Sequence, residues 1–230
     1  MLIALFIAWI WVDYFRLIDI FQKNKLLHVV LVFVAGSFCS FLVFPLNDLL
    51  IDPFGWTLNG NLINDFLYST IAIGMIEELV KILPFVLFLL FFSKHLKEPI
   101  DYLAFVAISA LGFSATENVF YFMESSMAIN SRSILCSVGH MFDTCIIAYG
   151  VILYRFHEKF KSPLIILLCF VLAALAHGIY DFWLLNQTFA YGYLITILFF
   201  FFYISIFATI LNNAINNSSY FTYKKAIDTD

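Results

Sequence analysis

The sequence predicts an all-α polytopic membrane protein, a bundle of about seven transmembrane helices. Hydrophobic residues make up 63% of the 230 residues, charged residues only 12%, and the mean hydropathy is +0.95. A typical soluble domain has about 45–50% apolar and about 25% charged residues. The basic residues also gather at alternate ends of the apolar runs. These observations exclude an ordinary soluble enzyme and favour a single integral-membrane domain over residues 1–230.

Seven apolar runs are long enough to cross a bilayer. A transmembrane helix needs about 20 residues, because it rises about 1.5 Å per residue through about 30 Å of hydrocarbon. The predicted helices cover residues 1–21, 27–46, 65–92, 102–124, 134–156, 164–185 and 189–212. The first run lacks a basic segment and a small-residue cleavage site, so we expect a retained helix rather than a signal peptide. The third run is long, and we expect it to tilt or to bend at Pro84.

Two further features carry no predicted chemistry. The segment 47–64 contains two glycines, a proline and a tryptophan and is typical of an interfacial loop or a short re-entrant piece. The four cysteines lie in apolar runs without CxxC spacing, so we expect small buried residues rather than disulfides or metal ligands; they are Cys39, Cys136, Cys145 and Cys169.

The basic residues predict the orientation. Ten of them fall on one side of the seven helices: Arg16, Lys23, Lys25, Lys94, Lys97, Arg155, Lys159, Lys161, Lys224 and Lys225. Only Arg132 falls on the other side, and Lys81 lies inside an apolar run. Because cytoplasmic loops are enriched in Lys and Arg, we expect an outside N-terminus and a cytoplasmic C-terminus in the cell membrane.

The third helix carries charge at membrane depth. Glu77, Glu78 and Lys81 interrupt its apolar run, and each charge costs at least about 2.5–3.5 kcal/mol to insert there. Glu77 and Lys81 are four residues apart and share a face, which predicts an ion pair. Glu78 points about 100° away from Glu77, so a pair between Glu77 and Lys81 leaves Glu78 unexplained.

Three more helices carry polar groups at comparable depth. They hold Glu117 and Asn118, then His140 and Asp143, then His177 and Asp181. We expect these groups to converge with the glutamate pair in the outer half of the bilayer. The predicted first, second and seventh helices have no ionisable group at such depth and are expected to form a lipid-facing frame.

This set of residues has the composition of a hydrolytic site. A buried carboxylate can act as general base for a water molecule, and an imidazole can stabilise an oxyanion or pass on a proton. Asp181 lies four residues after His177 and can orient its ring, while Asp143 and Thr144 can do the same for His140. Purely structural roles stay open for some of these residues. Glu77 and Lys81 can form a structural ion pair, Asp143 can be a structural partner of His140, and Asn118 can satisfy the hydrogen-bonding groups of its neighbours.

The motifs resemble those of the PrsW family of intramembrane proteases, in a superfamily with the CAAX prenyl proteases and bacteriocin-immunity proteins. The resemblance rests on Glu77-Glu78-x-x-Lys81, Phe113-x-x-x-Glu117-Asn118, His140 and His177-x-x-x-Asp181. Glu117 stands where related members carry a histidine, which favours the PrsW branch over the prenyl proteases. The resemblance covers roughly residues 65–181, so the expected catalytic core is about 65–185.

The resemblance implies a metal-independent, glutamate-type peptidase that cuts membrane-anchored proteins. It implies that Glu77 and Glu78 activate the water and that His140 and His177 stabilise the oxyanion. Glu117, Asn118 and Asp181 then complete the site, with Lys81 in a supporting role. We prefer Glu78 as the base, since Lys81 can neutralise Glu77. The implied biology is site-1 cleavage of a single-pass anti-sigma factor in the bilayer; no cofactor and no nucleic-acid partner are expected.

Other classes of protein stay open. Two histidines and several carboxylates on different helices can also form a zinc site, which gives a zinc-dependent intramembrane protease. Buried acids and histidines also make proton relays, as in a proton-coupled transporter, although no inverted repeat is visible. A catalytically inactive scaffold or immunity protein is the third alternative. Insensitivity to chelators separates the first of these from the glutamate type, and a proton-flux assay tests the second.

Overall fold

The computed structural model describes residues 2–18, 26–124, 129–185 and 192–218, and the regular elements in those ranges are all helical. The α-helices are α1 (Leu2–Ile18), α2 (Leu26–Cys39), α3 (Val43–Leu50), α4 (Leu62–Leu67), α5 (Ile76–Phe92), α6 (Pro99–Glu124), α7 (Ile129–Phe156), α8 (Leu164–Leu185) and α9 (Gly192–Asn216). A π-helix, η3, spans Tyr68–Met75 and joins α4 to α5. The predicted fold class is confirmed.

Helices occupy the described part of all seven predicted runs, with two differences, and residues 1, 19–21 and 189–191 of these runs lie outside the described residues. In the part of the chain described, four stretches are long and apolar enough to cross a membrane: Leu26–Phe54, Pro99–Met123, Leu135–Phe156 and Leu164–Leu185. The second run therefore does not end at residue 46, because α3 continues it to Leu50. The third run passes through Pro84 within one helix, α5, and its irregular part is the π-helix that precedes the glutamates.

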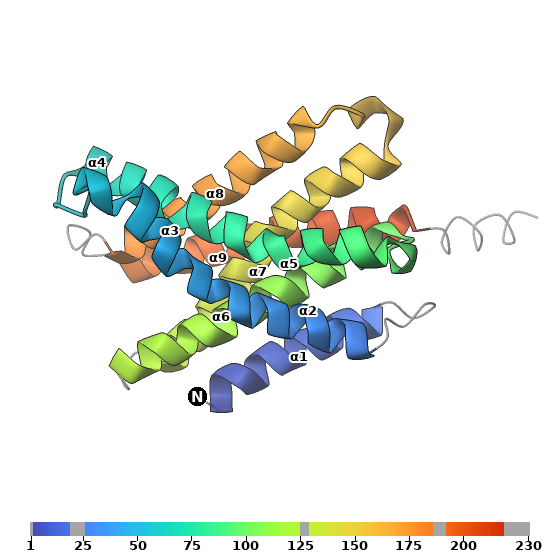
Figure 1. Ribbon diagram of the computed structural model, residues 1–230, viewed down its shortest axis with the longest axis horizontal. Coiled ribbons are helices and arrows are strands. Elements are labelled where there is room, and N and C mark those ends of the chain that lie inside the picture. Colours follow the sequence, from blue (N-terminus) through green and yellow to red (C-terminus); the bar gives the residue numbers. More distant parts are fainter. Residues whose placement is uncertain (1, 19–25, 125–128, 186–191, 219–230) are drawn as a thin grey trace, which may run out of the picture.

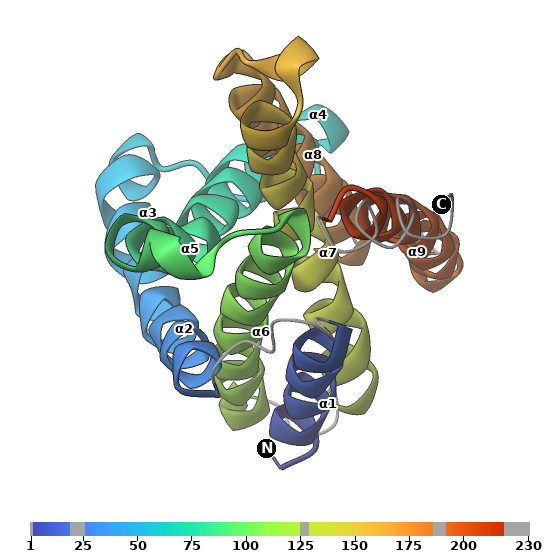
Figure 2. The ribbon, with the colours of Figure 1, turned by 90° about the vertical axis from the view of Figure 1, so that its right-hand side faces the viewer.

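Helices α6 and α7 form the inner part of the bundle. Figure 2 shows α6 between α1, α2, α5 and α7, and α9 on the far side of α7. In α6 and α7, 78% of the membrane-spanning stretch is buried, compared with 22% from Leu26 to Phe54 and 28% in α8. The α7–α8 hairpin projects away from α5 at the end where α7 meets α8 (Figure 1). The two inner helices therefore contact α1 and α9 on one side and the helices of the site on the other.

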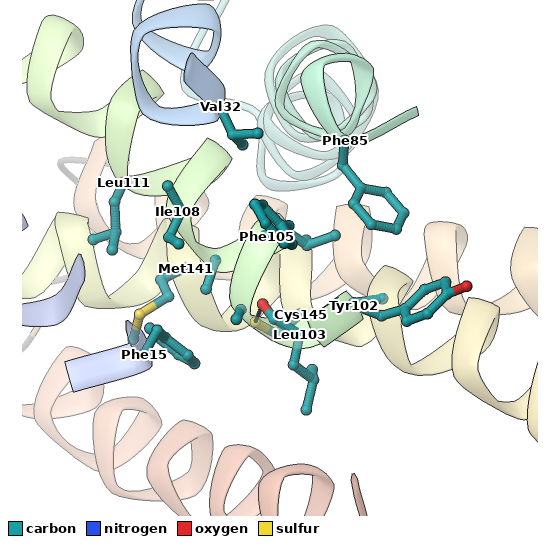
Figure 3. Close-up of a cluster of buried hydrophobic side chains, with 14 of the residues drawn as sticks. Phe15, Val32, Phe85, Tyr102, Leu103, Phe105, Ile108, Leu111, Met141 and Cys145 are labelled. Carbon is teal, nitrogen blue, oxygen red and sulfur yellow. Dashed lines mark hydrogen bonds between the residues drawn. The ribbon is translucent and has the colours of Figure 1, made fainter. Parts of the chain in front are cut away.

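The apolar core surrounds the first half of α6. Phe15, Leu103, Phe105 and Met141 are all fully buried in it, and they come from α1, α6 and α7 (Figure 3). Helices α2 and α6 approach closely because Gly112 lies against the Phe33 carbonyl, where a Cβ atom would clash. Small residues allow such backbone approach between membrane helices, where van der Waals packing provides much of the attraction.

A second close approach joins the π-helix to α8. A Cβ on Gly74 would lie 2.6 Å from the Ala174 carbonyl oxygen, and one on Gly178 would clash with Thr70. Because both positions lack a side chain, the start of α5 lies directly beside the middle of α8. This contact carries Glu77 and Glu78 to the helix that holds His177.

The cysteines agree with the expectation in most respects. All four are free, and Cys136, Cys145 and Cys169 are buried. Cys39 is only half-buried, so the prediction that it is buried was wrong. It lies on α2, which has most of its surface outside the bundle.

Candidate active site

Seven ionisable side chains from four helices form what we call the polar cluster: Glu77, Glu78 and Lys81 of α5, Glu117 of α6, His140 of α7, and His177 and Asp181 of α8. Their charged or ring atoms are joined by contacts of 2.6–3.8 Å. The expected convergence of these residues is therefore present. The π-helix and its contact with α8 place the glutamates, and α6 and α7 close the cluster from the core side.

Lys81 lies at the centre of the cluster and is fully buried. Its Nζ atom lies 2.8 Å from Glu78 Oε1 and 3.2 Å from Glu77 Oε2. The same atom is 2.6 Å from His140 Nδ1 and 3.1 Å from His177 Nδ1. A buried ammonium is tolerated only where such partners replace its hydration. Lys81 is thus a fixed cation that holds three helices together.

The expected separation of Glu78 from Lys81 was wrong. The pair of Glu77 with Lys81 is present, but the contact of Lys81 with Glu78 is the shorter of the two. Residues three apart on a helix are neighbours as much as residues four apart, and the long lysine stem lets the ammonium lie between both carboxylates. Lys81 consequently does not distinguish the two glutamates.

The remaining contacts of the two glutamates do distinguish them. Glu78 is fully buried, and both of its oxygens are engaged, Oε1 by Lys81 and His177 and Oε2 by the Thr144 hydroxyl at 2.8 Å. Glu77 keeps some exposure, and its Oε2 atom accepts no hydrogen bond of good geometry from the described residues. Glu78 thus has a hydrogen-bond partner on each oxygen, whereas Glu77 Oε2 has an ion-pair contact with Lys81 but, within the described part of the chain, no hydrogen bond of good geometry.

Each histidine is oriented by a carboxylate. His177 Nε2 lies 3.2 Å from Asp181 Oδ2, which confirms the predicted pair. His140 Nε2 lies 2.7 Å from Glu117 Oε2, so the expectation that Asp143 and Thr144 orient this ring was wrong. Thr144 instead bonds Glu78 and the backbone carbonyl of His140. Thr144 shares a helix face with His140, but its hydroxyl contacts Glu78 on the neighbouring helix α5 and not the His140 imidazole ring.

The structure adds residues that the sequence did not suggest. The Ser109 hydroxyl donates to the Lys81 carbonyl at 2.6 Å, next to the turn that Pro84 deprives of a backbone donor. The Tyr203 hydroxyl, on α9, donates to the Ala176 carbonyl at 2.6 Å and also bonds Asp143. The seventh helix is therefore more than a lipid-facing frame. Tyr203, which follows directly after a run of phenylalanines, is the signal that could have indicated this.

Asn118 supports the cluster from outside it. Its amide nitrogen lies 3.3 Å from the Ser114 hydroxyl and 3.2 Å from the Ser137 hydroxyl, and the two hydroxyls are 3.0 Å apart. These contacts join α6 to α7 one turn from Glu117 and His140. They match the expectation that Asn118 satisfies neighbouring side chains.

A pocket of about 230 Å³ leads into the cluster between α3 and α6. Glu77 and Glu117 supply its acidic groups, and aromatic residues supply much of its wall: Phe44, Phe113, Phe120 and Tyr121. The volume is enough for one large side chain and a few water molecules, whose share of liquid volume is about 30 Å³ each. Glu77 is thus the member of the glutamate pair that faces open space.

Some of the same residues have the composition of a metal site. Two sets of donors lie within 4.8 Å of one another: Glu77 with His140 and His177, and Glu78 with Asp143 and His177. In the first set Glu77 Oε2 is 3.8 Å from His140 Nδ1 and 3.5 Å from His177 Nε2. Zinc ligands with bonds of about 2.0–2.2 Å at tetrahedral angles are about 3.3–3.6 Å apart, so these separations are close to suitable.

The position of Lys81 conflicts with a metal ion bound there. Its ammonium lies 2.6 Å from the same His140 Nδ1 and 3.2 Å from the same Glu77 Oε2. An imidazole nitrogen has one lone pair, so it cannot bond an ammonium and a metal ion together. A divalent cation beside an ammonium is also repelled. The donor types fit zinc, but the arrangement with Lys81 among them does not.

Two curated relatives carry the same printed name, "Protease PrsW". The relative from Clostridioides difficile (strain 630) is 26% identical over 193 residues, which is 81% of this chain and 78% of that protein. The relative from Shouchella clausii (strain KSM-K16) is 27% identical over 173 residues, covering 74% of this chain and 76% of its own. No solved structure matches.

A family model described as "PrsW family intramembrane metalloprotease" matches residues 24–209. The match begins before α2 and ends within α9, so it includes every residue of the polar cluster. The chain is a multi-pass membrane protein and a peptidase, and it belongs to the PrsW family of intramembrane proteases.

Proposed function

We propose that the chain is an intramembrane endopeptidase of the glutamate type, in which the Glu77 carboxylate activates a water molecule without a metal ion. The observation that carries the proposal is that Glu77 lines the pocket, and that its Oε2 atom, ion-paired with Lys81 at 3.2 Å, lies 3.5 Å from His177 Nε2 and accepts no hydrogen bond of good geometry from the residues that the structure describes. A general base must be within reach of a water molecule and have a lone pair for the proton that it removes. Glu78 is fully buried with a partner on each oxygen, so we assign the base to Glu77, contrary to the preference drawn from the sequence.

The reaction follows from this placement. A water molecule beside Glu77 gives a proton to its carboxylate while the water oxygen attacks the peptide carbonyl carbon. The oxyanion that forms accepts a hydrogen bond from the His177 Nε2–H group, which lies 3.5 Å from Glu77 Oε2. The His140 ring, bonded to Lys81 and Glu117, positions these groups. When the carbon–nitrogen bond breaks, the leaving amine takes the proton from Glu77. The carboxylate is then restored, and no atom or charge is left over.

The other members of the polar cluster position these groups. Asp181 and Glu117 each hold the Nε2 side of a histidine, which fixes the direction of the ring. Glu78 holds Lys81 and His177 in place through its two oxygens. Lys81 keeps the carboxylates from repelling one another. We therefore place the catalytic core at about residues 65–185, as the motifs suggest.

The substrate in this proposal is a membrane-anchored protein whose cleaved segment is unwound into the pocket between α3 and α6. A single-pass anti-sigma factor, cut at site 1, is the specific candidate that the family resemblance suggests. With Arg155, Lys159 and Lys161 on the cytoplasmic side, the N-terminus is outside and the cleavage point lies in the outer half of the bilayer.

A zinc-dependent protease is the second candidate function. The spacing of Glu77, His140 and His177 favours it, and so does the word "metalloprotease" in the family description. The position of Lys81 disfavours it. Metal analysis of the purified chain, together with cleavage in the presence of a chelator, decides between the two types.

The experiment that tests the proposal compares membrane proteomes of cells that express the native chain or Glu77→Gln at matched levels. We expect single-pass proteins to accumulate intact in the variant and to appear as fragments with the native chain, with or without a chelator. Glu158→Gln is the matched control, because the Glu158 side chain is 89% exposed and outside the cluster. Identical proteomes for native and Glu77→Gln would overturn the proposal, and loss of cleavage with chelator alone would favour the zinc type.

A further inference from the structure

A second hollow, of about 570 Å³, runs between α5, α7 and α8. No member of the polar cluster lines it. Its walls are almost entirely apolar and include Phe85 and Val86 of α5, Tyr102 of α6, Arg155 of α7, and Leu167 and Phe170 of α8. It lies where the α7–α8 hairpin projects away from α5 (Figure 1). We call it the lateral groove.

One end of the lateral groove is basic and polar. Arg155 lies in the last turn of α7, and its guanidinium carbon is 5.7 Å from the centre of the Tyr102 ring. The Lys161 ammonium donates to the Arg155 carbonyl at 3.1 Å, so a second cation is close by. The membrane-spanning stretch of α7 ends at Phe156. The basic end is therefore at the level where a bilayer presents its headgroups.

Tyr102 contributes a polar atom that lacks a partner. Its side chain is fully buried, and its hydroxyl has no hydrogen-bond partner among the described residues. Figure 3 shows the ring beside Phe85 with the hydroxyl directed away from the packed core. Buried tyrosine hydroxyls usually find a partner, so this atom indicates a polar group that the chain itself does not supply.

The chemistry of the groove favours a lipid as its occupant. Its walls are almost entirely apolar and one end carries the Arg155 cation, which matches an acyl chain below a charged headgroup. A lipid acyl chain is thin and flexible and can follow the apolar walls. Each CH₂ group that the chain buries contributes about 0.8 kcal/mol relative to water. Within a bilayer all lipids have acyl chains, so the headgroup decides which lipid the groove retains.

We propose that the lateral groove binds one phospholipid with an anionic headgroup. An acyl chain lies along Phe85, Val86 and Leu167. The phosphate accepts hydrogen bonds from the Arg155 guanidinium, whose planar fork matches phosphate oxygens, and the Tyr102 hydroxyl donates to an ester or phosphate oxygen. Basic pockets between membrane helices recognise anionic lipids by this combination of charge and apolar surface.

The test measures lipid binding to the purified full chain in detergent by native mass spectrometry. Phosphatidylglycerol and phosphatidylcholine are titrated separately. We expect the native chain to retain one phosphatidylglycerol and to bind phosphatidylcholine more weakly. Arg155→Gln should weaken phosphatidylglycerol binding about fivefold, the effect of one surface cation of about 1 kcal/mol, and leave phosphatidylcholine binding unchanged. Lys94→Gln, which removes an exposed cation outside the groove, is the control.

A second pair of variants tests the apolar part. Val86→Trp fills the groove and should abolish binding of both lipids, whereas Val171→Trp should not, because Val171 is similarly exposed (39% against 40%) but does not line the groove. Equal binding of the two lipids by the native chain, or equal effects within either pair of variants, would overturn the proposal. So would a photoreactive residue at position 86 that crosslinks in cells to a protein and not to lipid, since the occupant would then be a protein segment.

Discussion

The apolar core and the polar cluster are buried equally well and are built from opposite kinds of side chain. Leu103 and Phe105 are fully buried on one stretch of α6, and Glu78 and Lys81 are fully buried beside a later turn of the same helix. In a bilayer the first arrangement costs little, because lipid is as apolar as the core. The second is expensive. The contrast teaches that burial of the polar cluster has a high free-energy cost that an apolar core would avoid, and this supports a chemical role for the cluster.

The largest expected effect on the free energy of unfolding comes from removing Lys81, the central residue of the polar cluster. Lys81→Met leaves Glu77 and Glu78 facing each other without a cation, which should cost about 3–5 kcal/mol in the free energy of unfolding. The double variant Glu78→Met with Lys81→Met should recover part of that stability, since apolar groups replace the pair of Lys81 with Glu78, while Glu77 stays without its cation. Reversible unfolding in detergent measures both. A double variant as unstable as the single one would show that the cluster is required for the fold.

A truncation in the apolar core should have the opposite signature. Leu103→Ala should lower the free energy of unfolding by about 2–5 kcal/mol through the cavity it leaves, while the cleavage rate per folded molecule changes little. Thermal unfolding measures the loss of stability, and a cleavage assay on the same preparation measures the rate per folded molecule. A large loss of cleavage in a well-folded Leu103→Ala chain would contradict the view that the apolar core provides stability and the polar cluster provides catalysis.

The sequence predicted the helical fold, the apolar runs and the convergence of the polar residues from four helices. The pairs Glu77 with Lys81 and His177 with Asp181 were correct, because partners four apart on one helix depend only on helix geometry. The links between helices were not predictable: His140 to Glu117, Thr144 to Glu78, and Tyr203 to Asp143. They depend on how each helix is rotated, which is set here by packing such as the contact of Gly74 with α8.

A smaller effect is expected from the residues that orient the histidines. Asp181→Asn keeps the shape of the side chain and removes its charge beside His177 Nε2. A hydrogen bond to a charged group is worth about 1.5–3 kcal/mol, so the cleavage rate should fall by roughly 10- to 100-fold. The thermal midpoint should hardly move. A variant with the native rate would show that Asp181 does not assist catalysis and that Glu78 and Lys81 suffice to position His177.

The two glutamates provide the most direct test of the central claim, which is that Glu77 is the base and Glu78 the anchor. Cleavage of a substrate found in the proteome comparison, and the thermal midpoint, should be measured for Glu77→Gln and Glu78→Gln side by side. We predict that Glu77→Gln loses cleavage by on the order of 10²–10⁴ with an unchanged midpoint. Glu78→Gln should lower the midpoint and keep measurable cleavage per folded molecule. A stable, inactive Glu78→Gln beside an active Glu77→Gln would contradict the account.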